Sequence, residues 1–99
     1  MQETPTLSIQ VQCVNKTDRE SPHERISHIG GFRSDKSKWT LSQADAITGI
    51  EAGRWAFYVA RGGRRVGVVV VIGRGGPKYL KTVGDGEQPE ALLSLPDCG

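Results

Sequence analysis

The Gly62-Gly63 pair, set between two runs of β-forming residues at 54–61 and 64–72, limits what this chain can fold into more than any other feature. Two glycines supply the positive φ angles that a two-residue hairpin turn requires. The sequence therefore predicts a β-hairpin with this pair at its tip. Counting outward from the tip places these residues opposite each other on one face: Arg61 and Arg64, Val59 and Val66, Phe57 and Val68, Trp55 and Val70. Beyond the arginines this face is apolar, so we expect it to face the core.

The other face of the predicted hairpin is mixed in character. It carries Arg54 and Arg65 as well as Val69 and Val71. Tyr58 lies opposite Gly67 in this register, an arrangement in which the ring shields the backbone that glycine leaves bare. We therefore expect this face to be partly solvated.

The N-terminal segment 6–14 alternates apolar and polar residues, with Leu7, Ile9, Val11 and Cys13 on one side. A period of two predicts one half-buried strand. The following residues, 15–22, show no periodicity and are rich in turn formers, so they are predicted to form a polar loop.

Further elements follow from punctuation along the chain. Short strands are predicted at 24–29, ended by the Gly30-Gly31 pair, and at 78–83, with a charged turn at 35–38 between them. A short amphipathic helix is predicted to begin after Ser42 as N-cap and to end at Gly53.

These elements predict an α+β fold. We expect a small antiparallel sheet of about four or five strands, one main helix and a short C-terminal helical turn at 89–93. The chain has 99 residues, of which 36% are hydrophobic, so residues 1–99 are predicted to form one domain with an ordered core at about 6–97.

Neither the N-terminal residues nor the apolar runs of the chain have a feature of a secreted or membrane protein. Residues 1–7 are polar, and the apolar run 66–72 is too short to span a bilayer. We therefore predict a cytoplasmic protein without a membrane partner.

Cys13 and Cys98 lie near opposite ends, and we expect buried free thiols there, with a disulfide between them as the alternative.

Several segments together resemble a family of short bacterial proteins of uncharacterised function. They are NKTD at 15–18, PHERI at 22–26, IGG at 29–31, GGR at 62–64, YLKT at 79–82, DG at 85–86, and LLSLP followed by Cys98 at 92–98. The resemblance covers the chain from Ile9 onward and implies a stand-alone domain of about this length. It implies no activity, cofactor or catalytic residue.

The most polar segment, 15–25, is the first candidate ligand site. Lys16, Arg19, His23 and Arg25 are predicted to hold a phosphate or carboxylate, because arginine binds such groups in a bidentate manner. The alternative is that the polar residues make turn hydrogen bonds and the charges are simply solvated.

The hairpin is the second candidate site, for nucleic acid. Tyr58 stands between cations on the outer face, where an aromatic ring can stack on a base. The predicted contact residues are Arg54, Tyr58, Arg61, Arg64 and Arg65. The net charge of +2 and the pI of about 8.7 are too mild to support this function by themselves.

Catalytic and metal sites have weaker support. His23 and His28 with the two cysteines lack the paired spacing of zinc ligands, and Cys13 falls on the apolar side of its strand. We predict no catalytic residue, metal or cofactor, and lean against an enzyme.

The preferred function is a small non-catalytic binding module for nucleic acid or a phosphate-bearing ligand. The alternative is a protein–protein adaptor that uses an apolar sheet face or a sheet edge.

Overall fold

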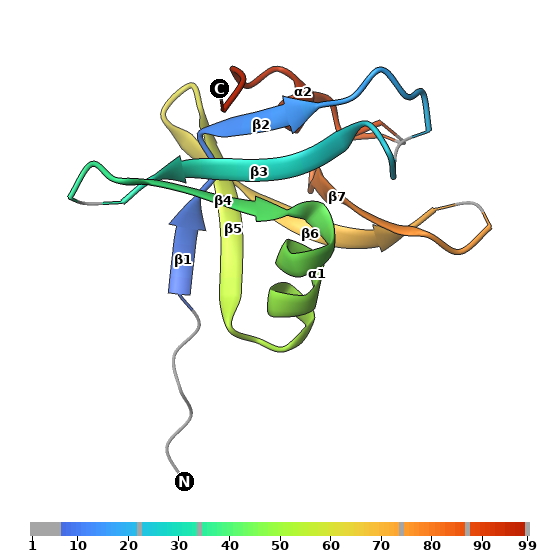
Figure 1. Cartoon of the computed structure of the whole chain (residues 1–99), viewed down its shortest axis with the longest axis horizontal. Coiled ribbons are helices and arrows are strands. Elements are labelled where there is room, and N and C mark those ends of the chain that lie inside the picture. The colour runs from blue at the N-terminus through green and yellow to red at the C-terminus, as the bar shows by residue number, and fades with distance from the viewer. Residues whose placement is uncertain (1–6, 22, 34, 74, 87, 99) are drawn as a thin grey trace, which may run out of the picture.

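The structure is a computed structural model that describes residues 7–21, 23–33, 35–73, 75–86 and 88–98, with the side chain of Arg61 left out. Figure 1 shows the path of the chain. Its elements are β1 (Leu7–Gln10), β2 (Cys13–Lys16), β3 (Ile26–Phe32), β4 (Lys38–Ser42), α1 (Gln43–Glu51), β5 (Trp55–Arg61), β6 (Arg64–Ile72), β7 (Lys78–Thr82) and α2 (Glu90–Leu93).

The strands form two sheets, where the sequence predicted one. A four-stranded sheet has the order β1-β5-β6-β7, and a three-stranded sheet has the order β2-β3-β4. The pair β1–β5 is parallel, and the other pairs are antiparallel. The α+β class is confirmed, but the single, wholly antiparallel sheet is wrong.

The second sheet arises because the predicted strand 6–14 divides in two. The Val11 amide donates to Tyr58 in the first sheet (2.8 Å), and the next amide, that of Gln12, donates to Gly30 in the second (2.9 Å). The chain thus changes sheets between these two residues. Leu7 is 60% exposed and Val14 is fully buried, so the predicted inward-facing set is wrong at both ends.

The hairpin is confirmed at its tip and shorter than predicted. Gly62 and Gly63 have φ angles of 56° and 81°, and the ladder runs from the pair Arg61–Arg64 to the pair Tyr58–Gly67. From Val68 onward, β6 pairs with β7 instead. The pairs Phe57–Val68 and Trp55–Val70 are therefore wrong as ladder partners, although Phe57 and Val68 are buried as predicted.

The helix α1 has the predicted ends. The Ser42 hydroxyl accepts a hydrogen bond from the Asp45 amide (3.1 Å), and Gly53 adopts a φ angle of 75° just after the C-cap. The strand β4 leads directly into this helix, and the predicted turn at 35–38 is correspondingly shorter.

The Gly30-Gly31 pair lies inside β3, whereas the sequence placed it at the end of a strand. A Cβ atom on Gly30 would lie 2.7 Å from the carbonyl oxygen of Trp39, and one on Gly31 would lie 3.0 Å from that of Gln10. These glycines permit close approach of backbones rather than a turn.

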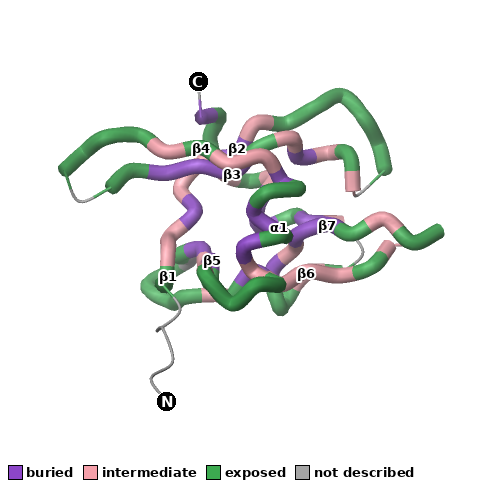
Figure 2. The backbone as a smooth tube through the Cα atoms, turned by 60° about the horizontal axis from the view of Figure 1, so that its bottom comes forward, coloured by how far each residue is buried: buried purple, intermediate pink, exposed green. Residues whose placement is uncertain are grey.

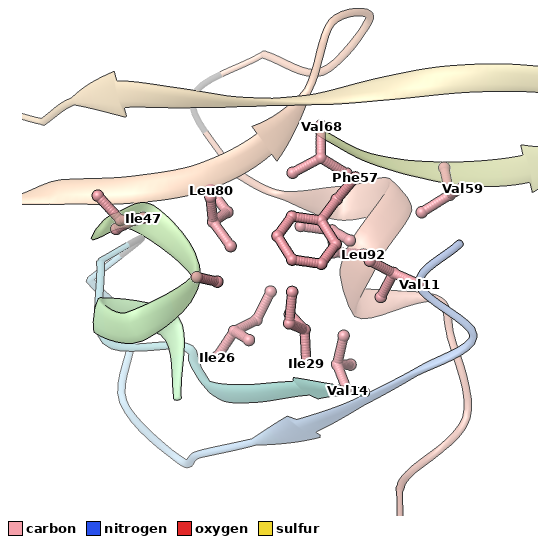
Figure 3. Packing of buried hydrophobic residues seen from close by; sticks show 11 residues of the cluster. Val11, Val14, Ile26, Ile29, Ile47, Phe57, Val59, Val68, Leu80 and Leu92 are labelled. Carbon is pink, nitrogen blue, oxygen red and sulfur yellow. The ribbon is translucent and has the colours of Figure 1, made fainter. Parts of the chain in front are cut away.

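One apolar core lies between the two sheets, and residues of α1 and α2 belong to it. Figure 2 shows the buried stretches along β3, α1 and β7. Figure 3 shows Phe57 and Leu80 of the larger sheet facing Ile26 and Ile29 of the smaller one. Leu92 of α2 is fully buried, and Leu93 and Leu95 pack against the cluster. Among the described residues, no helix has the length and apolar character needed to cross a membrane.

Candidate binding groove

A groove of about 550 Å³ lies where the two sheets diverge, between β1 and the β3–β4 hairpin. Four of the six aromatic residues of the chain line it. The lining residues are Ser8, Ile9, Gln10, Gln12, Phe32, Arg33, Trp39, Thr40, Leu41, Trp55 and Tyr58.

The groove rests on a stack of aromatic rings. Trp39 lies 5.9 Å from Phe57 between ring centroids in a stacked arrangement, and Trp55 lies 6.1 Å from the same ring. Gly49 in α1 has no room for a side chain because the indole of Trp55 occupies the place where a Cβ would stand. The floor is therefore aromatic and closely packed, with Phe57 buried beneath it.

One wall of the groove is the free edge of β1. The Leu7 amide donates to Arg54 (3.2 Å) and the Val11 amide donates to Tyr58, so the odd-numbered residues of β1 face β5. Hydrogen-bonding groups alternate along a strand, which turns the amides and carbonyls of Ser8 and Gln10 away from β5. The Gln10 carbonyl oxygen lies against Gly31 of β3, so the open groups of this edge are the two amides and the Ser8 carbonyl. In the part of the chain that the structure describes, the Ser8 and Gln10 amides have no hydrogen-bond acceptor.

The opposite wall is the free edge of β4. The Arg33 amide donates to the Ser37 carbonyl (2.8 Å). By alternation, the backbone amides and carbonyls of Gly31 and Ile29 also point toward β4, where they lie opposite Trp39 and Leu41. The same alternation turns the backbone groups of Thr40 away from β3. Within the described ranges, two strand edges therefore face one aromatic groove without a backbone partner.

The other two outer edges are covered. On β7, the Leu80 amide donates to the Gln43 side chain (2.9 Å) and the Thr82 amide donates to the Asp85 carboxylate (3.0 Å). On β2, the Val14 amide donates to the carbonyl of Pro96 (3.0 Å), which brings the C-terminal tail alongside.

The charge at the groove is positive. Arg33 lines it, and none of its described lining residues is a carboxylate. The guanidinium of Arg65 lies 4.5 Å from the centre of the Tyr58 ring, at the margin of the groove. These features favour a ligand that combines apolar groups with negative charge.

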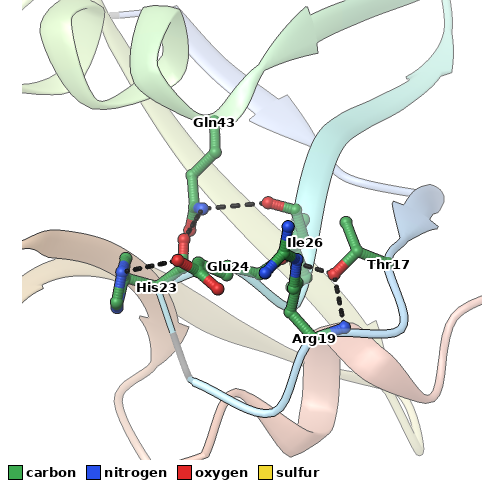
Figure 4. A network of polar contacts seen from close by, with 6 residues as sticks. All are labelled: Thr17, Arg19, His23, Glu24, Ile26 and Gln43. Atoms are coloured by element: carbon green, nitrogen blue, oxygen red, sulfur yellow. Dashed lines mark hydrogen bonds and ion pairs between the residues drawn. The ribbon is translucent and has the colours of Figure 1, made fainter.

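The predicted ligand loop is tied to the body of the protein (Figure 4). The Thr17 hydroxyl donates to the Glu24 carbonyl (2.6 Å) and accepts from the Arg19 amide (3.1 Å). Gln43 donates to the His23 carbonyl (3.1 Å), and the His23 ring lies 3.4 Å from the Glu24 carboxylate.

The four predicted ligand residues do not converge on one another through the described contacts. The Arg25 guanidinium donates to the side chain of Gln88 (3.1 Å), while Lys16 and Arg19 are exposed. The turn hydrogen bonds of Thr17 agree with the structural alternative for this loop.

The predicted nucleic-acid residues lie partly at the groove. Tyr58 lines it and Arg65 covers the Tyr58 ring, whereas Arg54 and Arg64 are exposed. The side chain of Arg61 lies outside the described residues. Phe32, Trp39 and Arg33 were missed, since their role depends on how the second sheet diverges from the first, and no local pattern records that angle.

The two cysteines form a disulfide, so the expectation of free thiols is wrong. The tail after α2 returns to β2, and the Cα atoms of Cys13 and Cys98 come within 4.9 Å of each other. His23 and His28 have separate partners, Glu24 and Ser27. The described residues contain no group of three histidine, cysteine or carboxylate side chains arranged to hold a metal ion.

A family model described as "protein of unknown function (DUF3892)" matches residues 10–96. This chain belongs to the DUF3892 family. No curated protein and no solved structure matches the chain. The DUF3892 match begins at the end of β1 and includes the β3–β4 wall and the aromatic floor of the groove, and it ends two residues before Cys98.

Proposed function

We propose that this protein is a non-catalytic binding module that accepts an extended peptide in its groove as an added strand beside β1. The observation that carries the proposal is the contrast between strand edges. Side chains or the tail cover β7 and β2, while Ser8 and Gln10 on β1 and Thr40 on β4 offer unpaired backbone groups to an aromatic groove.

Strand addition uses both properties of the groove. Main-chain hydrogen bonds to Ser8 and Gln10 would give affinity, and alternate side chains of the peptide would point to the floor or to solvent. The indoles of Trp39 and Trp55 suit apolar side chains on the floor. Arg33, with no carboxylate among the described lining residues, suits acidic side chains beside them. The preferred partner is therefore an acidic segment with alternating apolar residues.

The test is an NMR titration of the ¹⁵N-labelled protein with a blocked hexapeptide of alternating valine and glutamate. We expect shifts at Ser8, Gln10 and Thr40, slower hydrogen exchange at the first two amides, and a change in tryptophan fluorescence, because both tryptophans of the chain line the groove. A peptide of the same composition with N-methylated central residues is the control and should not bind. Shifts that leave β1 and β4 unaffected would contradict the proposal.

A nucleic-acid ligand is the second candidate, favoured by the cation–π pair of Arg65 and Tyr58 at the same groove. Titration with a single-stranded oligothymidylate at low and high salt distinguishes it from the peptide. Salt-sensitive shifts at Arg54, Tyr58, Arg61, Arg64 and Arg65, together with tryptophan quenching, would support base stacking in the groove. Shifts at Lys16, Arg19, His23 and Arg25 would instead support the anion site in the loop.

A further inference from the structure

A second hollow, of about 120 Å³, opens beside the Cys13–Cys98 disulfide. Both half-cystines line it, and so do two charged residues, the exposed Asp97 and Lys38. The ammonium nitrogen of Lys38 lies 3.4 Å from the carbonyl oxygen of Cys98. Cys98 is only 8% exposed, whereas Cys13 is half-buried. A small thiol can therefore reach the disulfide from the side of Cys13, and it would meet a cation there.

The disulfide fastens a tail that few other bonds hold. Beyond α2, the tail attaches to β2 through the Val14 amide to Pro96 (3.0 Å) and the Cys98 amide to the Asn15 side chain (3.3 Å). Single hydrogen bonds of this kind add little to stability because each replaces a bond to water. The covalent bond is thus the main closure over the edge of β2.

The same disulfide lies directly behind the groove. A Cβ atom on Gly30 would stand 2.9 Å from the Cys98 sulfur and 2.7 Å from the Trp39 carbonyl oxygen. The sulfur therefore packs against the β3–β4 pair, whose other side carries Trp39 into the groove. Four residues line both hollows: Gln12, Phe32, Trp39 and Thr40.

We propose that the Cys13–Cys98 disulfide is a thiol-exchange site whose reduction releases the C-terminal tail and loosens the groove. The effect on the groove rests on the proposed peptide-binding function, whereas the exchange and the release of the tail do not. The reductant is a dithiol, either a small molecule or a protein.

The exchange balances as two displacements. A thiolate of the reductant attacks the Cys13 sulfur, the disulfide breaks, and Cys98 leaves as a thiolate with the bonding electrons. The second thiol of the reductant then displaces Cys13 and closes its own disulfide. Two electrons pass to the protein, and the two protons of the dithiol end on Cys13 and Cys98. Lys38 lies beside the Cys98 carbonyl in the lining of the same hollow, and it is the cation that would stabilise the incoming and the departing thiolate.

The chemistry is tested by the rate at which dithiothreitol reduces the folded protein under native conditions. Removal of the cation in Lys38→Gln should slow the reaction roughly three- to tenfold. Lys36→Gln is the matched control, two residues away on the exposed turn, and should react as the wild type does. Equal rates in both variants, or reduction no faster than global unfolding, would overturn the proposal.

The structural consequence is tested by hydrogen exchange before and after reduction. We expect Val14 to lose protection at least about tenfold while Leu80, bonded to Gln43, keeps its own. Unchanged protection at Val14 overturns the release of the tail, and loss at both amides shows global unfolding and overturns it as well. Cys98→Ser should reproduce the reduced pattern without a reductant.

Titration of both redox states with the valine–glutamate hexapeptide separates the two proposals. Weaker binding after reduction is expected from loosening of the groove. Equal binding in the two states would overturn the coupling while leaving strand addition intact. Absence of binding in both states would overturn strand addition. Hydrogen exchange at Val14 would still test the release of the tail, because that measurement does not depend on peptide binding.

Discussion

The outer strands β7 and β1 lie at opposite edges of the same sheet, yet their backbones meet different surroundings. On β7, a buried glutamine and an aspartate accept hydrogen bonds from successive outward-facing amides, those of Leu80 and Thr82. On β1, the corresponding amides of Ser8 and Gln10 open onto a groove. An exposed edge invites pairing with another chain. This protein thus covers one edge and leaves the other available beside aromatic rings.

The covering of β7 uses one residue from a distant part of the chain and one from the turn that follows the strand. Gln43 is the first residue of α1, and Asp85 lies in the turn after β7. Asp85 also accepts from the amide of Ala91 in the first turn of α2 (3.2 Å), so the same carboxylate fastens both elements. By contrast, tryptophan side chains stand near β1, and these have no acceptor to offer an amide.

The largest expected effect comes from removing the cover of β7. Gln43 is only 7% exposed, and its side chain donates to the carbonyls of His23 and Ile26 and accepts from the amide of Leu80. Gln43→Leu leaves these three backbone groups without a partner, and we expect a loss of about 2–4 kcal/mol in the free energy of unfolding. Urea denaturation followed by circular dichroism measures it.

Gln10→Leu on the open edge is the matched control for that substitution. No hydrogen bond of the Gln10 side chain occurs among the described residues, so the free energy of unfolding should change by less than about 0.5 kcal/mol. Equal losses for the two variants would remove the contrast between the covered and the open edge.

Local patterns in the sequence contain much of the fold. The Gly62-Gly63 turn, the Ser42 cap and the Gly53 terminus each follow from residue chemistry within a few positions, and the structure has all three. The alternating pattern at 6–14 is equally clear, but it does not record which neighbour each half of the strand will pair with. That choice divides the strand between sheets at Gln12, and the α+β class survives while the single sheet does not.

Most of the groove could not be predicted from the sequence, because local patterns do not record how distant strands pack together. Tyr58 is predictable because it stands between cations on the outer face of the hairpin, whereas Trp39 and Phe32 join it only through the packing of the second sheet beside the first. A disulfide is the alternative that the sequence leaves open for the two cysteines. The tail returns to β2 and brings Cys98 to Cys13, but no residue pattern near either cysteine indicates that return. Short-range patterns predict elements, and long-range packing decides sites.

A pair of proline substitutions in β1 tests which of its amides are free. Ile9→Pro should cost about 2–3 kcal/mol more than Ile9→Ala, because it removes a donor that faces β5. Ser8→Pro removes a donor that faces the groove, so it should cost less than about 1 kcal/mol relative to Ser8→Ala. Thermal denaturation of the four variants gives both differences.

The same pair sharpens the functional side of the comparison. Ser8→Pro should fold normally and lose binding of the valine–glutamate hexapeptide, since its strand lacks one main-chain donor at the groove. If Ser8→Pro destabilises the protein as much as Ile9→Pro does, the Ser8 amide has an intramolecular partner and the edge is not open.

The smallest effect concerns the turn that carries the open edge of β4. In this exposed turn the Asp35 carboxylate accepts hydrogen bonds from the hydroxyl (2.6 Å) and the amide (3.0 Å) of Ser37. These bonds, with a minor contribution from Arg33, hold the pKa of Asp35 below its ordinary value of 3.8. Because folding lowers this pKa, the carboxylate stabilises the turn above the ordinary value, and the contribution is lost as pH falls through the folded value. The Ser37 amide resonance should therefore titrate with a midpoint below 3.8. Asp35→Asn should abolish that titration. The resonance of the Leu80 amide, which donates to Gln43, is the control and should not change over the same pH range in the wild type or in the variant. A midpoint at or above the ordinary value would show that the hydrogen bonds from Ser37 to Asp35 do not stabilise the turn. The β4 wall of the groove would then lack this support at the end farthest from α1.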